Sequence, residues 1–185
     1  MPRPITAIIH PNALAHNLDI ARKHMPESYV FAIVKADAYG HGIERVYAAF
    51  EAADGFGFLD IAEGVRLRAL GCQKSLLLLE GFFELQDLFD CAQYQLSFAI
   101  HSQYQVEWLK QFKEINQSAK FDVYLKMNSG MNRLGFSPSE YTNVYNELKK
   151  LNNVRSITHM THFSDADGQR FGKEGIQHQI EILKK

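Results

Sequence analysis

Residues 31–42 read FAIVKADAYGHG, an apolar run that ends at Lys35 and leads into a short segment with a tyrosine and two glycines. A short apolar run bounded by glycine is typical of a buried strand. The next residues, 43–50, place apolar side chains at helical spacing. In folds that alternate strands and helices, active sites lie at the carboxyl ends of the strands. The stretch therefore predicts a strand–helix unit with Lys35 at a functional edge.

The same alternation continues along the chain. Helical spacing also occurs at 141–148, at near-helical intervals from Leu14 to Met25, and in the terminal segment 172–185. Ser137, Pro138 and Glu140 give the 141–148 helix an N-cap, a proline at its first position and a capping-box glutamate. Further strands are predicted at residues 5–10, 56–60, 75–80, 95–100, 121–127 and 154–163.

Strand starts about 20 to 30 residues apart predict parallel strands joined by right-handed crossovers. An α/β chain of this kind forms either a doubly wound sheet or a (β/α) barrel, and propensity does not choose between them. A closed eight-stranded barrel needs about 250 residues, whereas this chain has 185. We therefore expect residues 1–185 to form about six βα units of an incomplete, truncated barrel, with no second domain.

The composition narrows the classes of partner. The chain is 46% hydrophobic and 22% charged, with 20 Lys and Arg against 21 Asp and Glu, which is ordinary for a globular domain. No basic run favours nucleic acid, and no stretch approaches the roughly 18 apolar residues of a membrane span. Cys72 and Cys91 are too few for a disulfide framework and lack metal-ligand spacing. We expect a cytoplasmic protein that binds a small molecule, with no nucleic-acid or membrane partner.

Two interpretations of Lys35 are open. A lysine at a strand end can extend its ammonium into solvent, with Gly40 and Gly42 serving turn geometry alone. Alternatively, Lys35 is a nucleophile or a Schiff-base lysine, which requires a neutral amine. From a reference pKa near 10.4, deprotonation at pH 7 costs about 4.6 kcal/mol. A dry barrel mouth or a neighbouring cation could lower the pKa of Lys35 enough to offset this cost.

A second cluster lies in residues 124–138, YLKMNSGMNRLGFSP. Alternation places Tyr124 and Lys126 on one face of a strand, and Arg133 follows in a short loop. Both charges could belong to the surface, with the Lys126 stem lying along the protein. Alternatively, the fixed fork of Arg133 is a clamp for a carboxylate or a phenolate oxygen.

A third cluster, THMTHFSDAD at 158–167, contains His159, His162, Asp165 and Asp167. We expect no metal here, because alternation sends the two histidines to opposite faces of a strand. His162 could stack on an aromatic ligand or relay protons. It could equally be a hydrogen-bonded histidine near a helix N-terminus that Asp165 caps. Glycine-rich nucleotide loops, GxSxG and CxxC are absent from the sequence.

Together, three segments resemble motifs of the alanine racemase family, pyridoxal-phosphate enzymes built on a (β/α)₈ barrel. AIVKADAYGHG is similar to the cofactor-lysine motif, KMNSGMNRLGF to the arginine-containing motif and THFSDAD to the histidine-containing motif. They occur in order through essentially the whole chain. The resemblance implies an isomerase that interconverts L-alanine and D-alanine with pyridoxal 5'-phosphate and supplies D-alanine for peptidoglycan in the cell wall.

The resemblance also implies a role for each matching residue. Lys35 matches the lysine that binds the cofactor covalently and acts as the base on the D-antipode, and Tyr39 matches a tyrosine that hydrogen-bonds the cofactor phosphate. Arg133 matches the arginine that contacts the phenolic oxygen of the cofactor and the substrate carboxylate. Lys126 matches a lysine that is carbamylated in many members and orients that arginine. His162 matches the histidine beside the pyridine ring.

Some of the family's machinery is expected outside residues 1–185. The resemblance implies a second base, a tyrosine from the C-terminal domain of the partner subunit, so the full-length form is expected to be a homodimer with shared active sites. We expect the chain to be inactive alone. Asn128 stands where many relatives carry aspartate, which leaves the local charge open.

Two alternatives remain. One is a non-catalytic pyridoxal-phosphate carrier with the same barrel, which the arginine motif disfavours because a carrier needs no clamp on a substrate carboxylate. The other is a racemase of related specificity that acts on serine, lysine or several amino acids.

Overall fold

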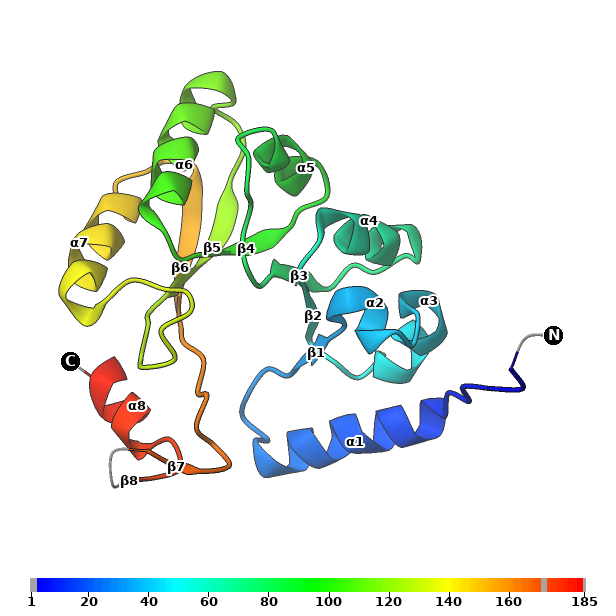
Figure 1. Cartoon of the computed structure of the whole chain (residues 1–185). Coiled ribbons are helices and arrows are strands. Elements are labelled where there is room, and N and C mark those ends of the chain that lie inside the picture. Colours follow the sequence, from blue (N-terminus) through cyan, green and yellow to red (C-terminus); the bar gives the residue numbers. More distant parts are fainter. Residues whose placement is uncertain (1–2, 171–172, 185) are drawn as a thin grey trace. The chain divides into compact units, whose positions relative to one another are not determined.

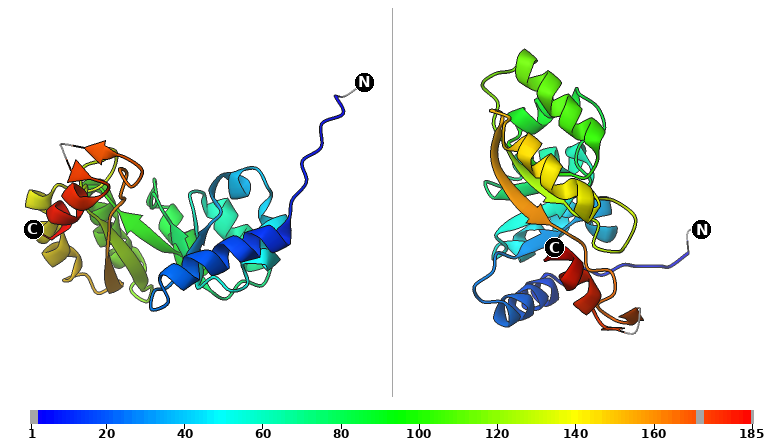
Figure 2. Two further views of the ribbon diagram at one scale, coloured as in Figure 1. Left: turned by 90° about the horizontal axis from the view of Figure 1, so that it is seen from below. Right: turned by 90° about the vertical axis from the view of Figure 1, so that its left-hand side faces the viewer.

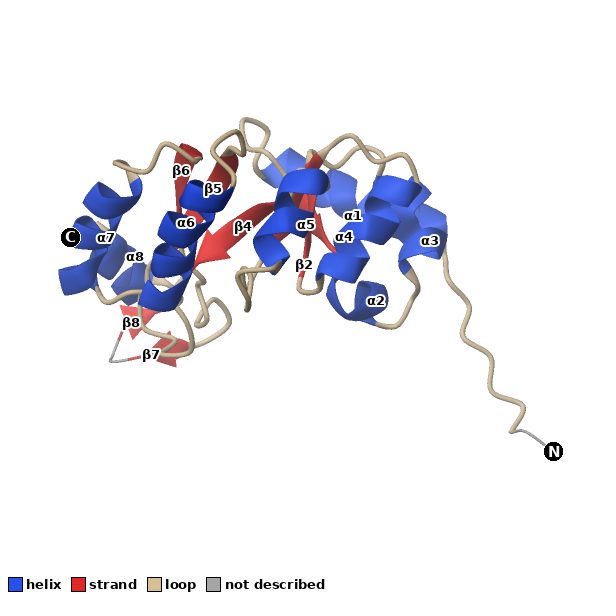
Figure 3. Ribbon diagram, turned by 90° about the horizontal axis from the view of Figure 1, so that it is seen from above, coloured by secondary structure: helices blue, strands red, loops and turns tan. Residues whose placement is uncertain are grey.

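The computed structural model describes residues 3–170 and 173–184. The chain divides into two compact units, Met1–Leu77 and Leu78–Lys185. Figure 1 shows the elements of both units, and Figure 3 shows that strands alternate with helices along the chain. Within the described residues, no helix has the length and apolar character needed to cross a bilayer.

Six strands form one sheet in which their order follows the chain. Pairing is parallel between the first two strands, between the fourth and fifth, and between the fifth and sixth. The six predicted strands from residue 31 onward are confirmed, although all except the one predicted at 95–100 end earlier than the apolar run that predicted them. They are β1 (Phe31–Ile33), β2 (Gly55–Phe58), β3 (Ser75–Leu78), β4 (Ser97–Ile100), β5 (Phe121–Lys126) and β6 (Val154–Met160).

The first unit places its helices around β1 and β2. Arg22 ties the first helix to the loop before β2, because its Nη1 donates to Asp54 Oδ2 at 2.7 Å and to Ala52 O at 2.8 Å. The same carboxylate accepts the Val30 N–H at 2.8 Å, which fixes the entry to β1. The helices are α1 (Pro11–His24), α2 (Lys35–Tyr39), α3 (Ile43–Val46), the 3₁₀ turn η1 (Tyr47–Phe50) and α4 (Ile61–Ala69).

Two local predictions in this unit are wrong. Residues 5–10 form no strand, and Ile5 and Ile8 are 78% and 72% exposed. Alternation alone does not make a strand, since the backbone groups also need a neighbouring strand to pair with. The helix expected over 43–50 is split into α3 and η1, and Gly42 precedes α3 with φ of 88°.

The second unit has an aromatic core beneath its helices. Phe98 lies at the centre, with ring centroids 4.9 Å from Phe82 and 5.1 Å from Phe121. The predicted cap of α7 is confirmed, because the Glu140 carboxylate accepts the Ser137 N–H at 3.0 Å. In Figure 1, α6 and α7 lie beside each other next to β5 and β6. The helices are α5 (Asp87–Gln93), α6 (Gln103–Ile115), α7 (Pro138–Leu148) and α8 (Gln177–Leu183).

The terminal segment differs from the expected single helix over 172–185. A two-stranded antiparallel hairpin, β7 (Gln169–Arg170) with β8 (Lys173–Glu174), precedes α8. Figure 2 shows this hairpin next to α8. Positions 172 and 185 of the predicted helix lie outside the described residues.

Gly81, which follows β3, offers a test of the packing in the second unit. Its φ is +71°, and an added Cβ would overlap the Ala99 carbonyl and the Gln105 amide. Gly71 has a similar φ of +87° but open space around it. Both Gly→Ala changes are expected to cost about 1–2 kcal/mol of unfolding free energy for the backbone conformation. Gly81→Ala should cost about 1–3 kcal/mol more from overpacking. Urea denaturation of the two variants measures that difference, and equal losses would contradict the close packing.

Candidate functional site

Lys35 lies at the carboxyl end of β1, as predicted, but it begins the turn α2 instead of ending the strand. The Val34 N–H donates to Gly57 O at 2.8 Å and extends the β1–β2 ladder by one residue. The Lys35 side chain is half-buried, and its Nζ lies 5.8 Å from the centroid of the Tyr39 ring. Tyr39 is 62% exposed. The structure therefore brings the predicted pair Lys35 and Tyr39 together.

The turn that joins these two residues is left-handed. Ala36, Asp37, Ala38 and Tyr39 have φ between 52° and 55°, although none of them is glycine. For L-amino acids this conformation costs roughly 1–2 kcal/mol per residue. Local hydrogen bonds, including Ala38 N–H to Val34 O and Gly42 N–H to Asp37 O, both 2.8 Å, close the turn. The sequence had indicated only that the glycines serve turn geometry, and Gly40 does continue the turn with φ of 81°.

A buried carboxylate beside this turn was missed by sequence reasoning. Glu63 is 7% exposed, and its Oε1 accepts the Asp37 N–H at 2.7 Å. Its Oε2 accepts the N–H groups of Leu59 and Asp60, the two residues just before α4, at 3.1 and 3.2 Å. The spacing of Asp60 and Glu63 is that of a capping box, so the sequence signal for the helix start was present. Nothing in that signal indicates the contact with Asp37.

The Asp37 carboxylate has partners of its own. Its Oδ1 accepts the Ile43 N–H at 3.1 Å and Arg66 Nη2 at 2.8 Å. The Ile43 N–H, and after it the Arg66 guanidinium, lower the pKa of Asp37 below its usual value. Arg66 also pairs with Glu44 on α3, which lowers the pKa of that carboxyl to about 2. Asp37 is therefore ionised at neutral pH and tied to both α3 and α4.

In the second unit, Lys126, Arg133 and His162 line one small depression. Lys126 is the last residue of β5 and is 6% exposed, whereas Asp122 and Tyr124 on the same face of the strand are half-buried. Arg133 comes from the loop after β5, and His162 follows the end of β6. The depression measures about 10 Å³, which is room for one water-sized group. The structure thus brings these three predicted residues together.

The loop that carries Arg133 is closed by an asparagine. Asn128 Oδ1 accepts the N–H groups of Gly130 and Asn132 at 3.1 and 3.0 Å. Gly135 has φ of 114°, and an added Cβ would lie 2.7 Å from Asn128 N, so the two arms of the loop approach closely. Aspartate could accept the same two N–H bonds, but it could not replace the bond that Asn128 Nδ2 donates to Asn132 Oδ1 at 3.0 Å.

Two other polar residues of the third cluster, His159 and Asp165, contact different partners. His159 faces α7, where its Nδ1 lies 2.8 Å from the Tyr141 hydroxyl and its ring stacks on Tyr145 at 5.5 Å. The Asp165 carboxylate lies 2.9 Å from His178 Nε2 on α8. Among the described residues, no group of three His, Cys, Asp or Glu side chains is arranged to hold a metal. His159 and His162 therefore have separate surroundings.

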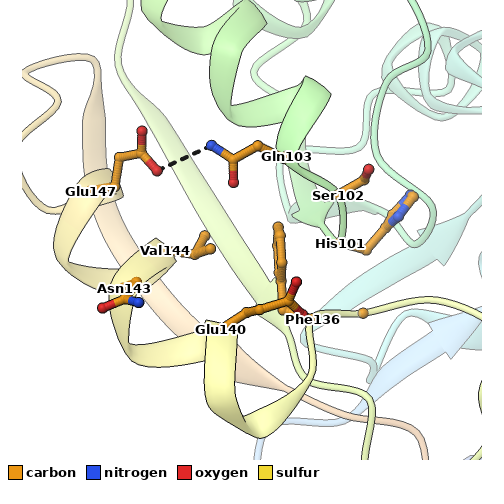
Figure 4. Close-up of a pocket in the computed structure, with 9 residues that line it drawn as sticks. His101, Ser102, Gln103, Phe136, Glu140, Asn143, Val144 and Glu147 are labelled. Carbon is orange, nitrogen blue, oxygen red and sulfur yellow. Dashed lines mark hydrogen bonds between the residues drawn. The ribbon is translucent and has the colours of Figure 1, made fainter.

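A larger cavity of about 490 Å³ lies between α6, α7 and the end of the Arg133 loop. Figure 4 shows its lining, in which the Gln103 amide donates to Glu147 at 3.2 Å. His101, at the carboxyl end of β4, has its Nε2 2.9 Å from Glu80 O. The cavity contains none of the predicted site residues. Its lining consists of His101, Ser102, Gln103, Gly135, Phe136, Glu140, Asn143, Val144 and Glu147.

Burial of His101 predicts an acid-sensitive stability. Burial, as the largest cause, lowers the pKa of His101 below its usual value of 6.5. As the pH falls below 6.5, His101 binds a proton in the unfolded chain before it does so in the folded protein. The stabilising contribution of neutral His101 is therefore fully present above pH 6.5 and is lost as the pH falls toward the lower pKa of the folded state. The loss is at most about 1.4 kcal/mol per pH unit.

Urea denaturation between pH 7.5 and 5 measures this effect. His101→Gln should reduce the pH dependence, whereas His16→Gln, on the exposed side of α1, should preserve it. Identical pH profiles for the wild type and His101→Gln would show that His101 titrates alike in both states.

Comparison with known proteins assigns the family. The profile described as "Alanine racemase, N-terminal domain" matches residues 9–185. The chain belongs to the alanine racemase family. It is 63% identical to an alanine racemase of Acinetobacter baumannii over 185 residues, which is all of this chain and 50% of that protein. An alanine racemase of Ralstonia pickettii is 50% identical over 185 residues, or 48% of its length.

Solved structures agree with this assignment. An alanine racemase structure from Acinetobacter baumannii matches 94% of this chain and 50% of its own with a TM-score of 0.82 at 34% identity. The biosynthetic alanine racemase of Pseudomonas aeruginosa matches 92% of this chain and 47% of its own, with a TM-score of 0.83 at 34% identity. The chain spans about half the length of the curated relatives it matches. The predicted fold class, an incomplete α/β barrel arrangement, is confirmed by this match.

Proposed function

We propose that this chain is the cofactor-binding half of a pyridoxal-phosphate-dependent alanine racemase that interconverts L-alanine and D-alanine. The observation that carries the proposal is the pairing of Lys35 with Tyr39 at one strand end, together with the gathering of Lys126, Arg133 and His162 around one depression. These are the residues that match the three motifs of the family. The full-length protein is then a cytoplasmic homodimer that supplies D-alanine for the cell wall.

The residues present fit pyridoxal phosphate. A half-buried amine at a strand end suits an aldehyde, and the Tyr39 hydroxyl suits a phosphate oxygen. The depression beside Arg133 is large enough for one oxygen atom and too small for a ring. When bound, the cofactor supplies an aldehyde that condenses with an amine with loss of water, and a conjugated system that accepts the electron pair left when the Cα proton is removed.

The protein's own residues then bind, orient and transfer protons. Lys35 holds the cofactor and, once the substrate amine replaces it, its neutral Nζ takes the Cα proton from D-alanine. Arg133 offers a planar guanidinium for the cofactor's phenolic oxygen and the substrate carboxylate. His162 would pack beside the pyridine ring of the bound cofactor. The base on the opposite face comes from residues outside this chain.

Lys126 is proposed to act through Arg133. A buried ammonium beside a guanidinium is unfavourable, because two like charges repel and Lys126 is only 6% exposed. Reaction of the neutral Lys126 amine with CO₂ would form a carbamate and release one proton. The side chain would then carry a negative charge that orients Arg133 by ion pairing.

Replacement of Lys35 tests the cofactor assignment. In the full-length protein, Lys35→Ala should abolish the absorption band of bound cofactor near the visible edge and lower racemisation by at least about 10²-fold. Borohydride reduction and peptide mapping should place the cofactor on Lys35 in the wild type. Lys23→Ala, on the exposed surface of α1, is the control. A band that survives in Lys35→Ala would show that another amine binds the cofactor, and a wild-type band without racemisation would favour a carrier.

Arg133→Lys tests the carboxylate clamp. The substitution keeps the charge but removes the bidentate fork. We expect kcat/KM for alanine to fall about 10- to 100-fold, chiefly through KM, since each lost hydrogen bond to a charged group is worth about 1.5–3 kcal/mol. Arg155→Lys, which affects an exposed ion pair with Asp122, is the control. An unchanged KM would show that Arg133 does not bind the substrate. A panel of other L-amino acids then tests the specificity for alanine.

A further inference from the structure

The left-handed turn after β1 is held from outside by one helix. Glu63 and Arg66 lie three residues apart on α4, so they share a face of that helix. The Glu63 carboxylate accepts the Asp37 N–H at 2.7 Å, and Arg66 Nη2 donates to Asp37 Oδ1 at 2.8 Å. The helix therefore contacts both the backbone and the side chain of one residue, Asp37.

Glu63 is held in place by the residues at the start of α4, independently of its contact with the turn. Its second oxygen accepts the N–H groups of Leu59 and Asp60, and Asp60 in turn caps α4 by accepting the Ala62 N–H at 2.8 Å. Glu63 is 7% exposed, so water competes little for these bonds. Charge-assisted bonds to backbone N–H groups are the stronger kind. The position of Glu63 is therefore set by the start of α4 and not by the turn.

We propose that Glu63 is a positioning residue that keeps residues 36–39 left-handed and thereby sets the place of the Lys35 amine relative to Tyr39. The inference rests on the proposed function, in which Lys35 binds the cofactor. Asp37 lies midway between Lys35 and Tyr39, whose amine and ring are 5.8 Å apart. If residues 36–39 relax toward ordinary φ values, the two side chains no longer leave the turn on the same side.

Glu63→Gln tests the proposal with little change of shape. Glutamine has one acceptor oxygen, so it satisfies either Asp37 or the start of α4, but not both. The matched control is Glu44→Gln, which also removes one negative charge but from a carboxylate that pairs with Arg66 and not with the backbone of the turn. Both variants are made in the full-length protein.

The first measurement needs no cofactor. Hydrogen exchange of residues 35–43 in the cofactor-free protein should be at least about tenfold faster in Glu63→Gln than in the wild type, and unchanged in Glu44→Gln. The second measurement is pyridoxal-phosphate binding, followed by absorption and by borohydride trapping at Lys35. The Kd should rise about tenfold or more in Glu63→Gln alone.

The outcomes separate the two proposals. Exchange that is equal in Glu63→Gln and Glu44→Gln would overturn the positioning role, as would faster exchange with an unchanged Kd. A wild-type protein that attaches no cofactor to Lys35 would overturn the proposed function, and exchange would still decide whether Glu63 holds the turn. If Glu63→Gln does not fold, Arg66→Gln removes the second contact from the surface of α4 and should shift both measurements in the same direction.

Discussion

The left-handed turn at residues 36–39 is the constraint on which the rest of the first unit depends. Four residues with side chains occupy a conformation that favours glycine, so the turn persists only because its surroundings determine it. Hydrogen bonds within the turn close it, and the Glu63 carboxylate holds the Asp37 N–H from α4. Because Lys35 and Tyr39 lie at the two ends of the turn, its hand decides how the amine and the phenol face each other. The strained backbone of residues 36–39 therefore lies directly beside Lys35, the residue with which the proposed chemistry begins.

The second unit uses a different device at its strand ends. The Ser129 and Thr161 hydroxyls lie 2.6 Å apart, and Thr161 donates to Met127 O at 3.0 Å, which ties the end of β5 to the end of β6. Side-chain amides then close the loop that presents Arg133. Here the backbone is kept in place by short polar side chains and by Gly135, where the loop crosses itself closely. Lys126, Arg133 and His162 lie around one depression because the neighbouring parallel strands β5 and β6 end at the same edge of the sheet.

Much of this organisation was predictable from residue patterns. The apolar runs located all six strands of the sheet, and the Ser137–Glu140 spacing located the start of α7, because both signals depend on neighbours close in sequence. The strand predicted at 5–10 was wrong, since a strand also needs a partner that local sequence does not provide. The role of Glu63 was missed for a related reason. Its capping spacing is local, whereas its bond to Asp37 joins residues 26 positions apart.

The sequence by itself determined the order of strands and helices, the family and the residues that match its motifs, since these follow from periodicity and from residue type at fixed spacing. Only the tertiary structure decided the hand of the turn after Lys35, the burial of Lys126 and the contact of Glu63 with Asp37. Those features depend on contacts between segments distant along the chain. Such contacts set backbone conformation and solvent exposure through packing and hydrogen bonding, and a local pattern of residue types does not encode them.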